Sequence, residues 1–382
     1  MKILVFESYT WYIYINEMEK VCVFCGQKPQ SKTLEHVLPQ WLIELTGDPK
    51  RKADFGYSKS TKGQHVRRIF VFDAFKFPSC RECNQRFANL EAGAKVIVGK
   101  MMSEVALSES ELSILLDWFD KVRLGLWLGY LYLDKNPLGV SPHFHVQHRT
   151  RYYDRMLAIF KGDGNMKGLN VMGCDTPAFA QIPSCFSLRI DNVWFLNMSF
   201  QFLLARRMGL PFASESYLGE GKRFHCSLAK GRNRIMRPVL KKAISIEGTE
   251  LYQPIFAGIM AAEGYDKLKK LYDTEYVRDT CISWEEGIGR IYIKNGSEVA
   301  PYSASPSMEW VPGKTHDFSK LSFDVQWITL EWQLYIMKNL LPSLKLLGEE
   351  RKREAIKLVN LGKYWNMELV EHLDKVKRYR LS

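Results

Sequence analysis

The sequence lacks long apolar runs, internal repeats and low-complexity tracts. Its 382 residues include 26 glycines and 15 prolines, too few for a collagen-like chain, and 46% are hydrophobic, too many for a disordered one. Beyond the N-terminal 20 residues, the longest apolar run is Leu124 to Leu133. It is about half of the ~20 residues that a transmembrane helix needs. We therefore expect an ordinary folded chain that does not cross a membrane.

The N-terminal segment lacks the marks of a secretory signal. Residues 1–20 are apolar in places, but Glu7 interrupts them and no small-residue cleavage site follows. We therefore expect a cytoplasmic protein. Met18 stands four residues before Cys22, and we hypothesise that translation begins there, so that residues 1–17 are not native.

Acidic residues are outnumbered by basic ones, and the formal net charge is +12 at pH 7. This excess favours a polyanionic partner, although a basic protein without such a partner has the same charge. The stretch from Lys222 to Lys242 contains no acidic residue. We expect it to follow a phosphate backbone, with a solvated loop as the alternative. Its candidate contacts are Lys222, Arg223, Arg232 and Arg234.

Only 8 cysteines are present, and in a cytoplasmic chain they indicate metal binding or burial rather than disulfides. Four of them form two C-x-x-C pairs, Cys22 with Cys25 and Cys80 with Cys83. Two such pairs complete a tetrahedral zinc site that has no open position. The spacing therefore predicts a structural Zn²⁺ ion, and two unrelated pairs of buried thiols are the alternative. The other cysteines have no ligand spacing.

Local signals predict several elements around these pairs. Pro39 and Gly47 bracket a short helix, and Ser108 with Glu111 forms a capping box at the start of a longer one. The expected elements are helices over Gln40–Thr46, from about Asn84, and from Ser108 to about Leu133, and a strand over Val66–Phe77.

The cluster Asp134–Pro142 is rich in turn-forming residues and marks a domain boundary. Beyond it we expect helices over Tyr152–Phe160 and Phe200–Met208, strands over Phe186–Ile190 and Val193–Met198, and a surface strand at the H-x-H-x-x-H sequence of 143–148. The predicted fold class is α+β. The expected parts are a zinc-stapled module at 18–105, a connecting helix at 106–135, an α+β domain at 136–325 and a helical basic tail at 326–382.

Three residues between or beside the cysteine pairs have the chemistry of a phosphodiesterase. Glu35 and His36 are adjacent, and Asn84 follows Cys83. A neutral imidazole can accept a proton from water, and carboxylate and amide oxygens can hold a divalent cation on a phosphate. Taken singly, His36 could be a structural histidine and Asn84 a helix cap.

The order CVFCG, EHVLPQWL and CRECNQRFANLE resembles bacterial HNH endonuclease-like proteins with a four-cysteine zinc site, over about residues 20–130. The resemblance implies a ββα-metal, treble-clef-like core. It also implies that His36 is the general base and that Glu35 and Asn84 bind the catalytic ion, Mg²⁺ or Mn²⁺. In two places this chain departs from the family, which more often has Asp at position 35 and has a middle Asn before the second cysteine pair. Asp73 or a backbone carbonyl could replace that Asn.

The sequence therefore predicts a nuclease with double-stranded DNA as its partner, and RNA is the alternative substrate. Arg81 and Arg86 are candidate phosphate contacts, with exposed bystanders as the alternative. The rest of the chain would select the target or regulate cutting, with a homodimer or a regulatory protein as a further partner. By analogy alone we expect a role in defence against phage. The rival hypothesis is a zinc-stapled nucleic-acid-binding or regulatory protein without catalysis.

Overall fold

The computed structural model describes residues 21–29, 31–59, 65–72, 76–133, 145–150, 153–200, 203–210, 212–218, 224–229, 246–255, 281–283, 288–302, 315–340 and 349–381. Several predicted features lie outside these ranges. They are the start at residues 1–17, the turn at 134–142, Asp73, and the basic residues Lys222, Arg223, Arg232 and Arg234.

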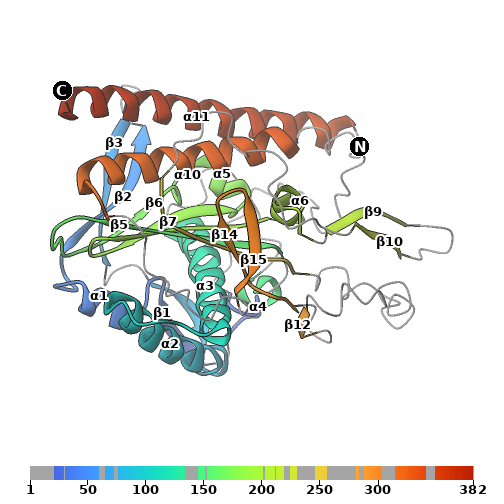
Figure 1. Ribbon diagram of the computed structural model, residues 1–382, viewed down its shortest axis with the longest axis horizontal. Coiled ribbons are helices and arrows are strands. Elements are labelled where there is room, and N and C mark those ends of the chain that lie inside the picture. The colour runs from blue at the N-terminus through green and yellow to red at the C-terminus, as the bar shows by residue number, and fades with distance from the viewer. Residues whose placement is uncertain are drawn as a thin grey trace.

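An eight-stranded sheet lies at the centre of the molecule (Figure 1). Its strand order is β15–β14–β11–β5–β8–β7–β6, and each neighbouring pair in this order is antiparallel. The eighth strand, β16, pairs with the end of β5 in parallel. The bounds are β5 Arg155–Gly162, β6 Leu169–Met172, β7 Cys185–Ile190, β8 Val193–Ser199, β11 Thr249–Gln253, β14 Tyr292–Asn295, β15 Glu298–Pro301 and β16 Thr315–His316.

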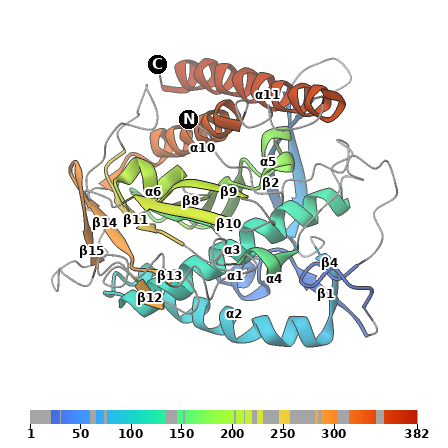
Figure 2. The ribbon, with the colours of Figure 1, turned by 90° about the vertical axis from the view of Figure 1, so that its right-hand side faces the viewer.

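Both faces of this sheet are covered by helices, as two perpendicular views show (Figures 1 and 2). Side chains alternate along a strand, so β5 sends Leu157 and Ile159 to one face and Met156, Ala158 and Phe160 to the other. The first face packs on α3 (Glu109–Leu133) and the N-terminal elements. The second packs on α10 (Phe318–Leu340), α11 (Glu349–Leu381), α5 (Pro177–Gln181) and α6 (Leu203–Met208).

The N-terminal residues form a turn, an antiparallel pair of strands and a helix beneath α3 (Figure 2). β1 (Lys32–His36) pairs antiparallel with β4 (Lys76–Cys80), and α2 (Arg81–Met102) follows β4 directly. Between β1 and β4 the chain forms α1 (Gln40–Leu45) and a hairpin of β2 (Lys52–Lys59) and β3 (His65–Val71). β2 also packs against β6 of the central sheet.

The remaining described elements are short. They are α4 Val146–Arg149, the hairpin of β9 Phe212–Leu218 and β10 Phe224–Ala229, and the paired strands β12 Cys281–Ser283 and β13 Ile288–Gly289. No helix among the described residues is long and apolar enough to cross a membrane.

Most elements predicted from local signals are present. The helices α1, α2, α3 and α6 and the strands β7 and β8 lie close to the predicted ranges, and the helical tail expected over 326–382 contains α11 and most of α10, which begins earlier, at Phe318. The strand expected over Val66–Phe77 is in fact parts of two strands, β3 and β4. Two predictions are wrong: the helix expected over Tyr152–Phe160 is strand β5, and the surface strand expected at 143–148 is helix α4 over Val146–Arg149.

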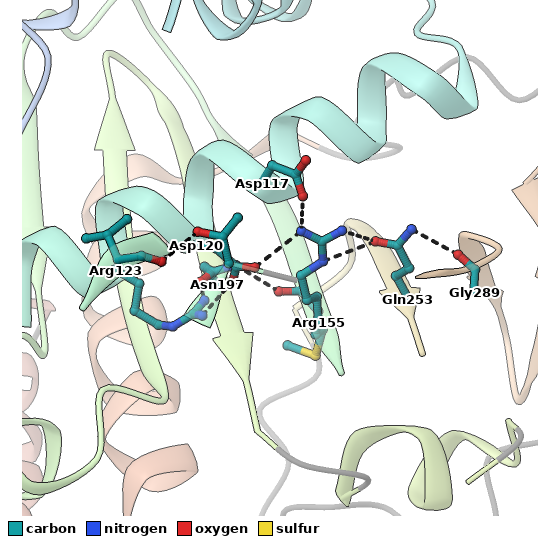
Figure 3. Close-up of polar contacts among 10 residues, drawn as sticks. Asp117, Asp120, Arg123, Arg155, Asn197, Gln253 and Gly289 are labelled. Carbon is teal, nitrogen blue, oxygen red and sulfur yellow. Dashed lines mark hydrogen bonds and ion pairs between the residues drawn. The ribbon is translucent and has the colours of Figure 1, made fainter. Parts of the chain in front are cut away.

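A buried ionic network joins α3 to the central sheet (Figure 3). Arg155 of β5 is fully buried, and its guanidinium contacts Asp117 at 2.5 Å and Asp120 at 3.2 Å. Asp120 also pairs with Arg123, which donates to Asn197 of β8 at 2.5 Å. Buried charges persist only where they are paired and hydrogen-bonded, so this network holds α3 in one place on the sheet.

Candidate metal centre and its surroundings

The first cysteine pair lies in a tight turn before β1. The Gly26 amide donates to the Cys22 carbonyl at 2.8 Å, and the Cys22 amide donates to the Gln27 carbonyl at 2.8 Å. Gly26 has φ +76°, a left-handed conformation that glycine adopts without steric cost. The turn therefore places Cys22 and Cys25 on the same side of the chain.

The second pair lies where β4 passes into α2. Cys80 is the last residue of β4, and Cys83 lies in the first turn of α2. The Cys80 amide donates to the Cys22 sulfur at 3.2 Å, and the Val23 amide donates to the Pro78 carbonyl at 3.1 Å. These backbone contacts fix the first cysteine turn against β4 and bring the two cysteine pairs together.

The four sulfur atoms can hold one metal ion such as zinc. All lie within 4.8 Å of one another, and the Sγ atoms of Cys25 and Cys80 are 3.9 Å apart. A tetrahedral ion with Zn–S bonds of about 2.3 Å requires sulfur atoms about 3.8 Å apart. The predicted pairing of Cys22 and Cys25 with Cys80 and Cys83 around one centre is thus confirmed in its geometry.

The thiols differ in their readiness to ionise. Burial opposes ionisation of Cys22, but backbone amides of Cys80, Cys25 and Phe24 donate to it, and its pKa is below the ordinary value. Burial and the neighbouring sulfurs raise the pKa of Cys80 to about 12, and that of Cys83 is raised as well. Since metal ligands are thiolates, an ion that binds here must displace protons.

Glu35 and His36 lie at the end of β1, on opposite faces of the strand. Glu35 pairs in register with the buried Phe77 and so faces α3. His36 is opposite Lys76, on the face that carries Leu34, which is 66% exposed. The strand therefore turns the carboxylate toward the interior of the fold and the imidazole away from it.

The Glu35 carboxylate belongs to an ionic cluster that the sequence did not predict. Lys121 of α3 contacts Oε1 of Glu35 at 2.9 Å and Oε1 of Glu91, on α2, at 2.5 Å. The second oxygen of Glu91 accepts the indole N–H of Trp41 at 2.9 Å and that of Trp118 at 3.3 Å. We call Glu35, Lys121 and Glu91 the lysine cluster.

Lys121 carries its charge in an almost dry environment. Its side chain is 5% exposed, and its Nζ also lies 5.7 Å from the ring centre of Phe24, in the first cysteine turn. Burial alone would lower the pKa of Lys121, but the carboxylates of Glu91 and Glu35 outweigh it, and the pKa is above its ordinary value. The only sequence signal of this residue is a lysine in a helix that is otherwise apolar over Leu115–Leu131, apart from the aspartates and arginine of the ionic network.

Asn84 and the two α2 arginines follow the second cysteine pair. Asn84 is partly buried in the first turn of α2, and no hydrogen bond joins it to Glu35 among the described residues. Arg81 and Arg86 are exposed, and Arg86 donates to Gln147 of α4 at 3.4 Å. The structure thus brings the cysteines together and places Asn84 beside them, but it links Glu35 to Glu91 rather than to Asn84.

α4 returns to the first cysteine turn from the other side. The amides of Val146 and Gln147 donate to the carbonyls of Val23 and Phe24 at 3.1 and 3.0 Å. The imidazole of His145 lies so close to Gly26 that a β-carbon there would be 2.5 Å from its Nδ1. The H-x-H-x-x-H sequence therefore contributes a packing contact to the cysteine turn.

Comparison of the chain with protein-family models, with curated proteins and with solved structures finds no match.

Proposed function

We propose that this protein is a metal-dependent HNH-type endonuclease that hydrolyses phosphodiester bonds of DNA. The observation that carries the proposal is the order of the N-terminal parts: a cysteine turn, the strand β1 with Glu35 and His36, its antiparallel partner β4, and the helix α2 with Asn84 in its first turn, with α1, β2 and β3 inserted between β1 and β4. This is the order of the ββα-metal, treble-clef-like core that the sequence resemblance implies.

The proposed structural ion is Zn²⁺, held by Cys22, Cys25, Cys80 and Cys83. Four thiolates fill a tetrahedral coordination sphere and leave no position for water or substrate. The ion would therefore hold the first cysteine turn against the junction of β4 and α2 without taking part in the reaction.

The proposed reaction uses three residues near this centre. His36, on the outward face of β1, accepts a proton from the attacking water, which requires the neutral imidazole. The oxygen Oε2 of Glu35 and the amide oxygen of Asn84 are the candidate ligands of a divalent ion. When bound, Mg²⁺ or Mn²⁺ would supply positive charge to the phosphate and the leaving oxygen. The exposed Arg81 and Arg86 would contact flanking phosphates.

The test is cleavage of supercoiled plasmid by the purified protein with Mg²⁺, with Mn²⁺ or with EDTA. We expect metal-dependent nicking, and we expect His36→Ala to slow it by about 100-fold or more, the range for loss of a general base. His372→Ala, which changes a histidine of α11, is the matched control and should cut as wild type does. Equal rates for His36→Ala and wild type would show that the assigned base is wrong.

A binding module without catalysis is the second candidate function. It is favoured by the ion pair between Glu35 and Lys121, because an ammonium group at 2.9 Å competes with a metal ion for the same carboxylate. In the plasmid experiment this candidate predicts retarded DNA migration with no nicking at any metal concentration.

A further inference from the structure

The lysine cluster joins one strand and two helices at the edge of the proposed site. Glu35 comes from β1, Glu91 from α2 and Lys121 from α3, while Trp41 of α1 and Trp118 of α3 contact Glu91. The carboxylates are each 14% exposed and the ammonium is 5% exposed. Burying three charged groups costs free energy unless each is paired and hydrogen-bonded, so their arrangement is tightly determined.

Resting on the function proposed above, we propose that Lys121 is a positioning residue: it holds Oε1 of Glu35 so that Oε2 is presented to the divalent cation. Glu91 holds Lys121 in turn, and the two indoles hold Glu91. The three residues have distinct tasks, and only Glu35 contacts the ion.

Glu91 serves as the fixed end of the cluster. Its Oε1 contacts Lys121, and its Oε2 accepts two indole N–H groups. With three donors in place, neither oxygen is well placed to bind a metal ion as well. The indoles belong to Trp41 and Trp118, whose ring centres lie 5.9 Å apart. The two rings that donate to the Glu91 carboxylate therefore also pack against each other.

Glu35 is the end of the cluster that remains open. Lys121 contacts its Oε1, and among the described residues no group donates to its Oε2. The net charge of the cluster is minus one, because Lys121 neutralises only one of two carboxylates. A carboxylate with one oxygen fixed and one open, in a site of net negative charge, is oriented for a divalent cation.

The experiment separates positioning from charge balance. Glu91→Gln with Lys121→Met leaves the cluster with the same net charge as wild type, because one positive and one negative group are removed together. Glu35 then keeps its own charge but loses the ammonium that holds it. Zinc content and Tm show that the double variant is folded, and the exposed Lys95→Met variant is the matched control.

We expect the double variant to need ~10-fold or more Mn²⁺ for half-maximal plasmid nicking, the usual effect of losing a group that orients a metal ligand. Mn²⁺ binding without DNA, followed by electron paramagnetic resonance, should weaken by the same factor. If the double variant retains zinc and matches wild type in both measurements, Lys121 only balances charge and the inference is overturned while the nuclease stands. If wild type nicks nothing, the proposed function itself fails.

Discussion

Glu111, at the start of α3, makes hydrogen bonds to Ser108 through both its carboxylate and its backbone amide, and an ion pair with Lys100. Glu111 accepts the Ser108 amide at 2.9 Å and contacts Lys100 of α2 at 2.5 Å, while the Glu111 amide donates to the Ser108 hydroxyl at 3.2 Å. Lys100, with the Ser108 amide, holds the pKa of Glu111 below its ordinary value. This capping box satisfies the first amides of the helix that lies beneath the central sheet.

Glu111→Gln should lower the free energy of unfolding by about 0.2–1 kcal/mol at neutral pH, because glutamine can still cap the helix and only the partly exposed ion pair with Lys100 is lost. Because the folded pKa is depressed, the contribution is present above the ordinary pKa of glutamate and is lost as pH falls through the folded value. Urea unfolding of wild type and variant at a series of pH values measures this. The curves should converge in acid, and Glu371→Gln, an exposed change on α11, should follow wild type throughout.

At the scale of residues, only patterns within a short stretch could be predicted. The spacing of the two C-x-x-C pairs is typical of a metal site. The spacing of Ser108 and Glu111 is typical of the start of a helix. Lys121 meets Glu35 across 86 positions and Glu91 across 30. No local rule pairs such residues, so the sequence did not predict the lysine cluster.

At the scale of elements, α3 joins the N-terminal parts to the sheet. Its residues from Leu115 to Gly129 are all buried, because the sheet covers one side and the cysteine turn, β4 and α2 cover the other. Two sets of charges mark these sides: Asp117 and Asp120 meet Arg155 of β5, and Lys121 meets Glu35 of β1. The charged residues of the helix thus fix its rotation about its own axis.

Arg155→Met should destabilise the protein by about 3–5 kcal/mol, because Asp117 and Asp120 would lose their shared cation in a buried place. Guanidinium unfolding followed by tryptophan fluorescence gives the difference. Arg353→Met is the control, since Arg353 is exposed on α11, and its effect should stay within about 0.5 kcal/mol. A loss below about 1 kcal/mol for Arg155→Met would mean that the network contributes little to stability.

The incorrect helix prediction for β5 has a physical cause. A strand with one face in solvent alternates apolar and polar residues, but β5 is central and covered on both faces, so its residues are apolar almost throughout. A short continuous apolar run does not distinguish a buried strand from a buried helix. β7 and β8 were predicted correctly because β-branched and aromatic residues end at a turn-forming Asp191–Asn192 pair.

At the scale of the molecule, one hydrophobic cluster runs from the cysteine turn to the central sheet. It includes Phe24, Phe77 and Trp118 near the cysteines and continues to Phe195 and Ile293 in the sheet. This cluster therefore contains residues on both sides of the boundaries predicted at residues 105 and 135. Composition marks a turn well, but it does not report whether the parts on either side pack together.

Removal of the metal should destabilise the whole chain in a single step. Chelation at neutral pH leaves four thiols in the shared core without their ion, and binding free energy is folding free energy in such sites. Calorimetry should show one unfolding transition for the whole chain both with and without a chelator. The chelator should move this transition to lower temperature. Two separate transitions, with the upper one unmoved, would show that the N-terminal part unfolds alone.

The return of α4 to the cysteine turn bears on the order in which a growing chain can fold. All four cysteines have left the ribosome soon after Cys83 is made, so the ion can bind early. The carbonyls of Val23 and Phe24 meet their partners only when Val146 and Gln147 emerge, more than sixty residues later. During that interval the four cysteines can already bind an ion, but the carbonyls of Val23 and Phe24 lack their helix partners, and α3 is not yet covered by the strands of the sheet.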